Sequence, residues 1–311
     1  MFGFRRPAVE SPPAGPVLEL SGDRLRRALA DLAESARPTG GIERYVTALQ
    51  LKSALFAELL GQGANALSEP EFLDLAAFMA PVRRRIAPVL ASRGIDGLRG
   101  PIHRLLTAAD GIDSRLTAFA AAFPPGAQMR WVRDLGSELL HFTAPDEVPL
   151  MTRWIWDAQV GTGALREIWH AEDVDQARIA VPDGLATFAS LRAELDGFLA
   201  GEGVFRDRTW VADLLLAHVY AAYINDRGSQ YLRSDFTVEG DPMLHTRRML
   251  GLDAVNTRTG RTRLRLIDGR AHEFGGGAAL RLALSDPSTP DPTASDPSTT
   301  DPSTEDRHAH P

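Results

Sequence analysis

The chain has 311 residues, of which 44% are hydrophobic and 24% are charged, and its formal net charge is −7. These values are typical of a globular protein with one large domain or two ordinary ones. The absence of cysteine excludes disulfides, thiolate metal sites and a cysteine nucleophile, and it agrees with a cytoplasmic location.

The positive charge comes almost entirely from arginine, because Lys52 is the only lysine. A phosphate-binding loop of the Walker A type needs a lysine after its glycines, and no such sequence is present. A Schiff-base mechanism would depend on Lys52 alone. Lys52 lies in a segment with helical periodicity, and we expect it at a solvated position of that helix.

The beginning of the chain is rich in proline and has little periodicity, so residues 1–20 are predicted to be a disordered segment. No apolar stretch typical of a secretion signal follows the first arginines. The longest apolar run, residues 214–224, is too short to cross a bilayer. We therefore expect a cytoplasmic protein that does not enter a membrane.

Helical periodicity dominates from residue 21 to about residue 250, and Ser68 to Glu71 has the pattern of a capping box. The segment 210–226 is apolar nearly all round, which is typical of a helix in the middle of a bundle, and we expect its His218 to be buried and hydrogen-bonded. Prolines and a glycine at 124–126 mark a candidate boundary inside this body. The other well-defined predicted helices are 42–60, 112–123, 127–142, 149–160, 164–171, 185–200 and 241–250.

After residue 250 the apolar residues alternate with a period of two. Residues 253–268 alternate about Thr259-Gly260, so the part 251–285 is predicted to be a β-hairpin appendage. The last part, 286–311, repeats Asp-Pro-[Ser/Thr] and is predicted to be a disordered acidic tail. The predicted fold is therefore mainly α, with a multi-helix globular body over 21–250, a small C-terminal β-hairpin and disordered termini.

The tail also changes how the charge is distributed. From Asp286 onward six acidic residues stand against Arg307, which gives −5 of the total of −7 and leaves about −2 for residues 1–285. A nearly neutral body gives no general electrostatic reason to expect nucleic acid or an anionic membrane as a partner.

Two Glu-x-x-His pairs lie in the tryptophan-rich stretch from 131 to 175, Glu138 with His141 and Glu167 with His170. Residues three apart share a helix face, so each pair could bind one metal ion. The two tetrapeptides resemble the Glu-x-x-His motifs of di-iron carboxylate bundles, and the resemblance does not extend beyond them. The structural alternative is that each histidine is placed near a helix C-terminus, where the helix dipole favours it.

Two sets of side chains in or near this stretch are candidates for a site. Carboxylates that follow His170 in a short loop suit a hard cation or proton transfer, although such loops are usually only solvated. The candidate metal or acid–base residues are His141, His170, Asp173 and Asp175. Large aromatic side chains could line a pocket, and core packing explains them equally well. The candidate pocket residues are Trp154, Trp156, Trp169, Tyr220 and Tyr223.

The predicted hairpin places Arg261, Arg263 and Arg265 on one face of a strand, with Arg258 close in sequence. Such a ribbon can bind an acidic protein or enter the major groove of DNA. The structural alternative is an edge strand that uses charge to prevent aggregation. A further hypothesis is that the acidic tail folds over this ribbon and competes with anionic partners.

No motif in the chain fixes a reaction or a cofactor. The first functional hypothesis is a cytoplasmic accessory or protein-interaction protein without catalysis of its own, which binds a protein partner in a groove between helices or through the arginine hairpin. The alternative is a metal-dependent or acid–base enzyme with its site in residues 131–175. Nucleic-acid binding through Arg258 to Arg270 is the third hypothesis, and the nearly neutral body argues against it.

Overall fold

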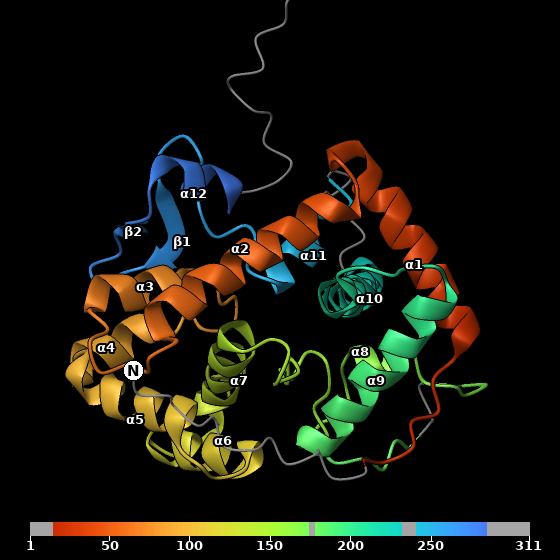
Figure 1. Cartoon of the computed structure of the whole chain (residues 1–311), viewed down its shortest axis with the longest axis horizontal. Helices are drawn as coiled ribbons and strands as arrows, with labels where there is room; N and C mark the ends of the chain where they lie inside the picture. Colours follow the sequence, from red (N-terminus) through yellow and green to blue (C-terminus); the bar gives the residue numbers. More distant parts are fainter. Residues whose placement is uncertain (1–14, 174–177, 232–240, 285–311) are drawn as a thin grey trace, which may run out of the picture.

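The computed structural model describes residues 15–173, 178–231 and 241–284 (Figure 1). Within these ranges the fold is mainly α with a small antiparallel sheet near the C-terminus, which confirms the predicted fold class. The tail 286–311 and most of the N-terminal segment lie outside the described residues.

The helices and strands have the following bounds: α1 Gly22–Ala36, α2 Ile42–Leu60, α3 Glu69–Ala77, α4 Ile86–Arg93, α5 Asp96–Thr107, α6 Ile112–Ala121, α7 Trp131–Thr143, α8 Ala164–Glu167, α9 Leu185–Gly201, α10 Arg208–Tyr231, α11 Leu244–Met249, β1 Arg261–Arg265, β2 Ala271–Glu273 and α12 Ala278–Ala283. Two short 3-10 turns cover Arg37–Thr39 and Ala127–Met129.

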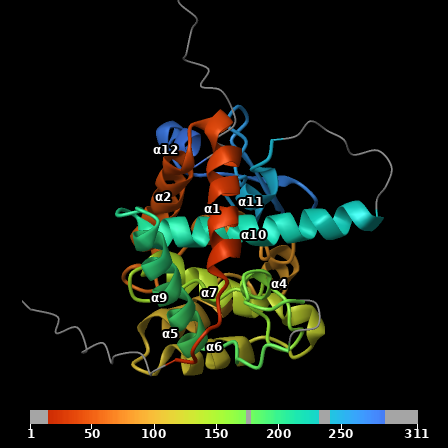
Figure 2. The same ribbon diagram turned by 90° about the vertical axis from the view of Figure 1, so that its right-hand side faces the viewer.

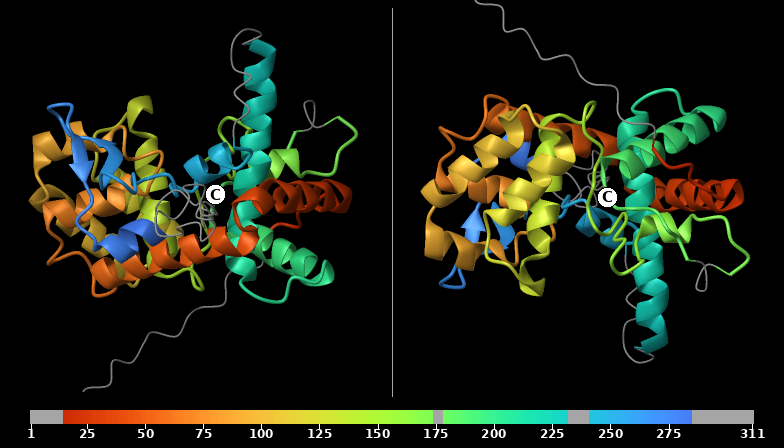
Figure 3. Two further views of the ribbon diagram at one scale, coloured as in Figure 1. Left: turned by 90° about the horizontal axis from the view of Figure 1, so that it is seen from above. Right: turned by 90° about the horizontal axis from the view of Figure 1, so that it is seen from below.

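Two groups of elements are joined by α2, which runs roughly along the long axis of the molecule from one group to the other (Figures 1 and 3). One group contains α3 to α6 with the sheet and α12, and the other contains α1, α8 and α9. α7 lies between the groups and packs against the middle of α2. The side chains where α2 and α7 meet are therefore at the centre of the fold.

α10 is the central helix of the second group, as its apolar sequence predicts. It contacts α1, α2, α8, α9 and α11, and residues 210–219 are all buried. His218 is buried and lies within hydrogen-bonding distance of Thr246 Oγ1 at 3.1 Å and Asp31 Oδ2 at 2.8 Å, which confirms its expected role. The far end of α10 extends beyond the neighbouring helices (Figure 2). No described helix is long and apolar enough to cross a membrane.

The candidate boundary at 124–126 separates α6 from α7 in the sequence but not in space. The two helices pack against each other, and the Phe123 ring lies 6.5 Å from the Trp131 ring in an edge-on arrangement. Side chains on both sides of this break, including Phe56 and Leu215, belong to one hydrophobic core.

Residues 149–163 form successive turns, so the predicted helix 149–160 is wrong. The cause is a set of partners on α7. The Asp134 carboxylate accepts hydrogen bonds from the Arg153 backbone N–H at 2.9 Å and from its guanidinium at 2.6 and 3.0 Å. A backbone group that is satisfied by a distant side chain does not need the hydrogen bond of a helix.

The predicted helix 164–171 is reduced to the single turn of α8, because the chain after this turn pairs with the segment before α1. The Ser21 N–H donates to the Ile168 carbonyl at 2.8 Å, and the His170 N–H donates to the Glu19 carbonyl at 2.7 Å. At the start of α8, the Ala164 N–H donates to the Trp154 carbonyl at 2.9 Å. Gly163 has φ +137°, and a Cβ there would lie 2.4 Å from the Ile155 carbonyl oxygen. Only glycine permits this close return of the chain.

The β-sheet begins at the predicted turn but pairs mainly with a later segment. Gly260 has φ +68°, and the chain before it forms one antiparallel bridge, between Val255 and Thr262. The sheet itself joins β1 to β2, with Arg261 opposite Glu273. β1 therefore has backbone partners on both of its edges near its start.

The sheet packs against α3 and contributes to the main core. Leu264 and Phe274 are buried in it, and the Phe274 ring lies 5.6 Å from the Phe78 ring. His272 Nε2 lies 2.7 Å from Asp74 Oδ1 on α3. These contacts fix the outward face of β1 relative to the helices.

The capping box predicted at the start of α3 is present. Its contribution to stability can be tested by substitution of Glu71. The Ser68 N–H donates to Glu71 Oε2 at 2.7 Å, and the Glu71 N–H donates to Ser68 Oγ at 3.4 Å. The hydrogen bonds from Ser68 hold the pKa of Glu71 below its ordinary value. We expect Glu71→Ala to lower the free energy of unfolding by roughly 0.5–1 kcal/mol at pH 7.

This loss depends on pH in a definite direction. A lowered pKa means that the contribution is complete above the pKa of the unfolded chain, about 4.3, and is lost as the pH falls through the lower pKa of the folded chain. Urea unfolding at pH 7 and pH 3 should show the difference shrinking in acid. The exposed neighbour Glu69 serves as control, and an equal effect of Glu69→Ala would contradict the role of the cap.

Candidate functional site

The centre of the fold holds a buried ion pair that involves the only lysine. Lys52 is 0% exposed, so the expectation of a solvated position is wrong. Its Nζ donates to Glu138 Oε2 at 3.0 Å and to the carbonyls of Phe78 and Leu250 at 2.8 and 2.9 Å. All three ammonium donors are therefore satisfied, and Nζ also lies 3.7 Å from the centre of the Phe142 ring.

Lys52 is buried because α2 packs against α7 at this position and the end of α11, at Leu250, lies against its ammonium group. Burial lowers the pKa of Lys52 and raises the pKa of Glu138, while the attraction between them opposes both shifts. An enclosed ammonium with every donor occupied acts as a structural cation that ties three separated segments together.

A second buried pair joins α7 to α10. His141 is fully buried, and its Nδ1 lies 2.8 Å from the Val148 carbonyl oxygen. A carbonyl only accepts, so Nδ1 must carry a hydrogen. Its Nε2 lies 2.9 Å from Asp213 Oδ2, although the two atoms are not in line for a hydrogen bond. The two side chains therefore form a buried pair between α7 and α10 without a hydrogen bond between these two atoms.

A small cavity of about 20 Å³ lies beside this pair. Arg192 and Asp213 contribute its charged groups, and Thr209 with several apolar residues completes the lining. Arg192 is fixed by the Pro145 and Val148 carbonyls at 2.6 and 3.3 Å. A volume of this size holds about one water molecule, whereas small-molecule pockets are usually above about 300 Å³.

The predicted metal residues are distributed over different environments. His141 is buried in the pair described above, whereas His170 and Asp173 are exposed. The backbone N–H of His170 donates to the Glu19 carbonyl at 2.7 Å. Asp175 lies outside the described residues. Among the described residues, no three histidine, aspartate or glutamate side chains are grouped so that they could hold a metal ion.

The predicted aromatic pocket residues fall into three places. The Tyr220 ring lies 6.2 Å from the Trp154 ring and 5.8 Å from the Tyr223 ring, so these three form one cluster at the base of the extended end of α10. Trp156 is directed elsewhere and donates to the Val181 carbonyl at 3.1 Å. Trp169 is half-buried and pairs with the chain near Leu20.

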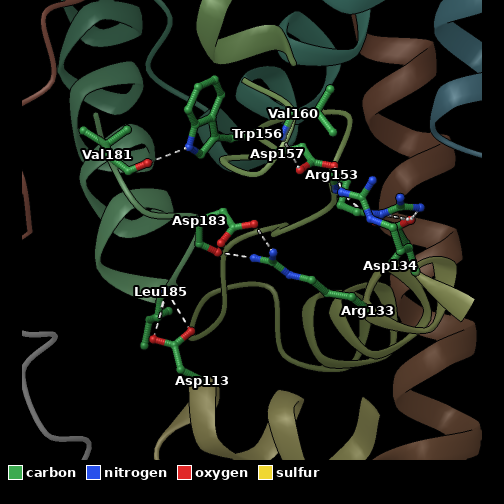
Figure 4. Close-up of polar contacts among 11 residues, drawn as sticks. Asp113, Arg133, Asp134, Arg153, Trp156, Asp157, Val160, Val181, Asp183 and Leu185 are labelled. Carbon is green, nitrogen blue, oxygen red and sulfur yellow. Dashed lines mark hydrogen bonds and ion pairs between the residues drawn. The ribbon is translucent and has the colours of Figure 1, made fainter. Parts of the chain in front are cut away.

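A series of polar contacts fixes the turns around Trp156 to α7, and the segment that leads into α9 to α6 and α7 (Figure 4). In addition to the pair between Asp134 and Arg153, the Arg133 guanidinium contacts the carboxylate and carbonyl of Asp183. The Asp113 carboxylate accepts from the Leu185 N–H at 2.9 Å, at the start of α9. The turns after α7 and the start of α9 are thus held in place by specific polar contacts.

The exposed face of β1 provides a different kind of candidate site. Arg261, Arg263 and Arg265 are exposed and alternate with the buried residues Thr262 and Leu264, as the period of two predicts. Together with Arg258 in the preceding turn and Arg248 at the end of α11, we call them the arginine face. The described residues 241–284 contain eight arginines and four acidic residues, against a net charge of −7 for the chain.

The Asp253 carboxylate lies beneath the arginine face and contacts three arginine side chains. Its side chain is 1% exposed, and its carboxylate lies 2.7 Å from Arg83 Nη1, 2.9 Å from Arg263 Nε and 3.9 Å from Arg248 Nε. Three guanidinium groups thus surround one carboxylate. Arg83 is buried, whereas the side chains of Arg248 and Arg263 are 42% and 50% exposed. Excess positive charge is therefore presented to solvent at a fixed position.

Protection of an open strand edge does not explain the charge at Arg261 and Arg263. Over residues 261–263 both edges of β1 are occupied, because Arg261 pairs with Glu273 of β2 while the Arg263 N–H donates to the Ala254 carbonyl at 2.8 Å. An edge that is already paired needs no charge to guard it. Ile267, in the turn between β1 and β2, is 68% exposed beside these arginines. Arginine with an exposed aliphatic side chain is a composition found at protein interfaces.

Sequence reasoning missed the groups that organise both regions. Arg83 lies in a run of three arginines that gives no local sign of burial, yet Asp253 pairs with it in the interior. Asp213 gave the clearest available signal, an acidic residue within an apolar helix. Comparison with protein-family models, with curated proteins and with solved structures finds no match to this chain.

Proposed function

We propose that this chain is an accessory protein without catalysis of its own, and that it binds an acidic segment of a partner protein on the arginine face. The observation that carries the proposal is the arrangement around Asp253, where three guanidinium groups share one carboxylate. Two of them, from Arg248 and Arg263, are half-exposed and can form further charge-assisted hydrogen bonds.

The spacing of the arginines favours an extended ligand. Alternate residues of a strand lie about 7 Å apart on the same face, so Arg261, Arg263 and Arg265 form a row about 14 Å long. Carboxylates at alternate positions of an extended peptide have the same spacing. Ile267 at the end of the row would contact an apolar residue of the same segment.

The short length of the row favours protein over nucleic acid. A row of about 14 Å meets few phosphates, whereas binding to duplex DNA depends on many such contacts. Glu273 lies 3.9 Å from Arg261, and Asp268 pairs with Arg270 at 2.5 Å, so two exposed carboxylates neutralise part of the positive charge near the row.

A binding measurement with matched variants tests this proposal. Fluorescence anisotropy should detect a labelled peptide with glutamate at alternate positions and one central leucine. We expect the triple variant Arg261→Gln, Arg263→Gln, Arg265→Gln to bind about 30-fold more weakly, which corresponds to about 0.7 kcal/mol for each exposed ion pair.

The control removes the same charge elsewhere. Arg27, Arg104 and Arg178 are exposed and lie on other parts of the molecule, and their triple change to glutamine should weaken binding only slightly. Equal weakening by the two triple variants would show that net charge and not the arginine face attracts the peptide. Tighter binding of duplex DNA, with a steep loss on adding salt, would instead favour a nucleic-acid partner.

A second candidate, acid–base or metal chemistry in the 131–175 stretch, is supported by the pair of His141 and Asp213. His141 Nε2 lies 2.9 Å from Asp213 Oδ2, and Asp213 lines a small cavity. Elemental analysis of the purified chain separates the metal version from the binding proposal. Near-stoichiometric iron, manganese or zinc would favour the second candidate.

A further inference from the structure

We infer that the acidic tail, residues 286–311, binds the arginine face of its own chain and competes there with the partner's acidic segment. The inference rests on the proposed function, because it assigns a regulator to the same surface. It combines three observations: where the described chain ends, the charge of the two segments and the spacing of the tail's acidic residues.

The described chain ends beside the start of the arginine face. α12 lies against the turn that leads into β1, since a Cβ on Gly260 would be 2.6 Å from Arg281 Nη1. Leu284 is buried, so the chain is anchored up to that point. Asp286, the first acidic residue of the tail, follows Arg281 by five residues and is therefore within about 17 Å of it. The tail needs no long connection to reach Arg258 and Arg261.

The charges of the two segments are complementary. The tail has six acidic residues and one arginine, and the described residues 241–284 have eight arginines and four acidic residues. Aspartates at 286, 291, 296 and 301 are each followed by proline, which favours an extended chain of about 3.1 Å per residue. Five residues of such an extended chain would span about 16 Å, which is close to the length of the row formed by Arg261, Arg263 and Arg265.

Attachment of the tail makes even a weak contact effective. A segment tethered by a few residues has a local concentration in the millimolar range, so it can occupy a surface for which its free form has low affinity. A partner must then displace it, and its apparent affinity falls by the fraction of chains in which the face is free.

Three forms of the chain test this inference with the glutamate peptide: the full chain, a chain that ends at Ser285, and a full chain with a neutral tail. The neutral tail carries the changes Asp286→Asn, Asp291→Asn, Asp296→Asn, Asp301→Asn, Glu305→Gln and Asp306→Asn. We expect the truncated and the neutral-tail chains to bind the peptide about fivefold more tightly than the full chain. In the triple variant Arg261→Gln, Arg263→Gln, Arg265→Gln, removal of the tail should leave the affinity for the peptide unchanged.

Each other outcome is decisive. Equal affinity of all three forms overturns the inference but leaves the proposed function standing. Tighter binding after truncation but not after neutralisation would mean that the tail obstructs the surface without using its charge, which also overturns it. If no form binds the peptide, the proposed function fails, and a second readout decides the inference alone.

That second readout needs no partner. The chain has no cysteine, so Ala294→Cys gives one site for a nitroxide spin label in the tail. We expect the label to broaden the amide NMR signals of residues 261–265 at physiological salt, and to broaden them much less in the neutral-tail chain. Equal broadening over the whole surface, or none at residues 261–265, would overturn the inference.

Discussion

Lys52→Ala is expected to lower the free energy of unfolding by about 3–5 kcal/mol, because it leaves Glu138 as a buried charge without a partner. The change also removes the donor to the Phe78 and Leu250 carbonyls, which hold α3 and α11 against α2. Urea unfolding at pH 7, followed by circular dichroism and tryptophan fluorescence, measures the loss as a shift of the midpoint.

Two controls separate the ion pair from simple loss of volume. The double variant Lys52→Met, Glu138→Leu replaces the pair with apolar groups of similar size, and we expect it to be more stable than Lys52→Ala. The loss of stability in Lys52→Ala should also narrow as the pH falls. Burial raises the pKa of Glu138 even beside Lys52, and removal of the lysine removes the attraction that opposes this rise, so protonation of Glu138 then relieves the cost. If Lys52→Ala were as stable as the unchanged protein, the buried pair of Lys52 and Glu138 would be contradicted.

Asp253→Ala is also expected to lower the free energy of unfolding by about 3–5 kcal/mol, because it leaves the buried positive charge of Arg83 without its partner. The Arg83 guanidinium is buried and forms two hydrogen bonds with this carboxylate, at 2.7 and 3.2 Å. Arg263 contacts the same carboxylate from the exposed side. We expect Arg263→Gln to cost less than about 1 kcal/mol, because a half-exposed arginine can be solvated when it loses its partner.

The comparison of these two variants tests how the arginine face is built. If Asp253 mainly pairs with Arg83, the two losses of stability differ several-fold in urea unfolding. Similar losses would mean that the exposed arginines are needed for the fold, and the face would then be a structural feature and not a surface available to a partner.

Local patterns in the sequence are sufficient for much of the fold. Apolar spacing predicts α2, α6, α9 and the central position of α10, and the Ser68-x-x-Glu71 pattern predicts the start of α3. Alternation predicts that Arg261, Arg263 and Arg265 share an exposed face. These features depend on residues a few positions apart, so a single sequence contains the information that determines them.

The remaining features depend on contacts between distant residues. The predicted helix 149–160 is replaced by turns because the Arg153 N–H donates to the Asp134 carboxylate. Lys52 can be buried because Glu138 on α7 pairs with it. The spacing of apolar residues in the sequence reveals neither Asp134 nor Glu138 as a partner. The pairing of His141 with Asp213 joins residues 72 positions apart in the same way. Charged residues are the ones most often misplaced by local reasoning, since a buried charge requires a partner whose position only the fold determines.

The central claim, that the arginine face is a surface for an acidic segment, is tested most directly by NMR of the arginine side chains. The Nε–Hε signals of the truncated chain ending at Ser285 can be followed while the glutamate peptide is added. We expect the signals of Arg248, Arg261, Arg263 and Arg265 to shift together and to saturate, while that of Arg104 stays in place. Shifts spread evenly over all exposed arginines, or confined to arginines outside the face, would contradict the claim.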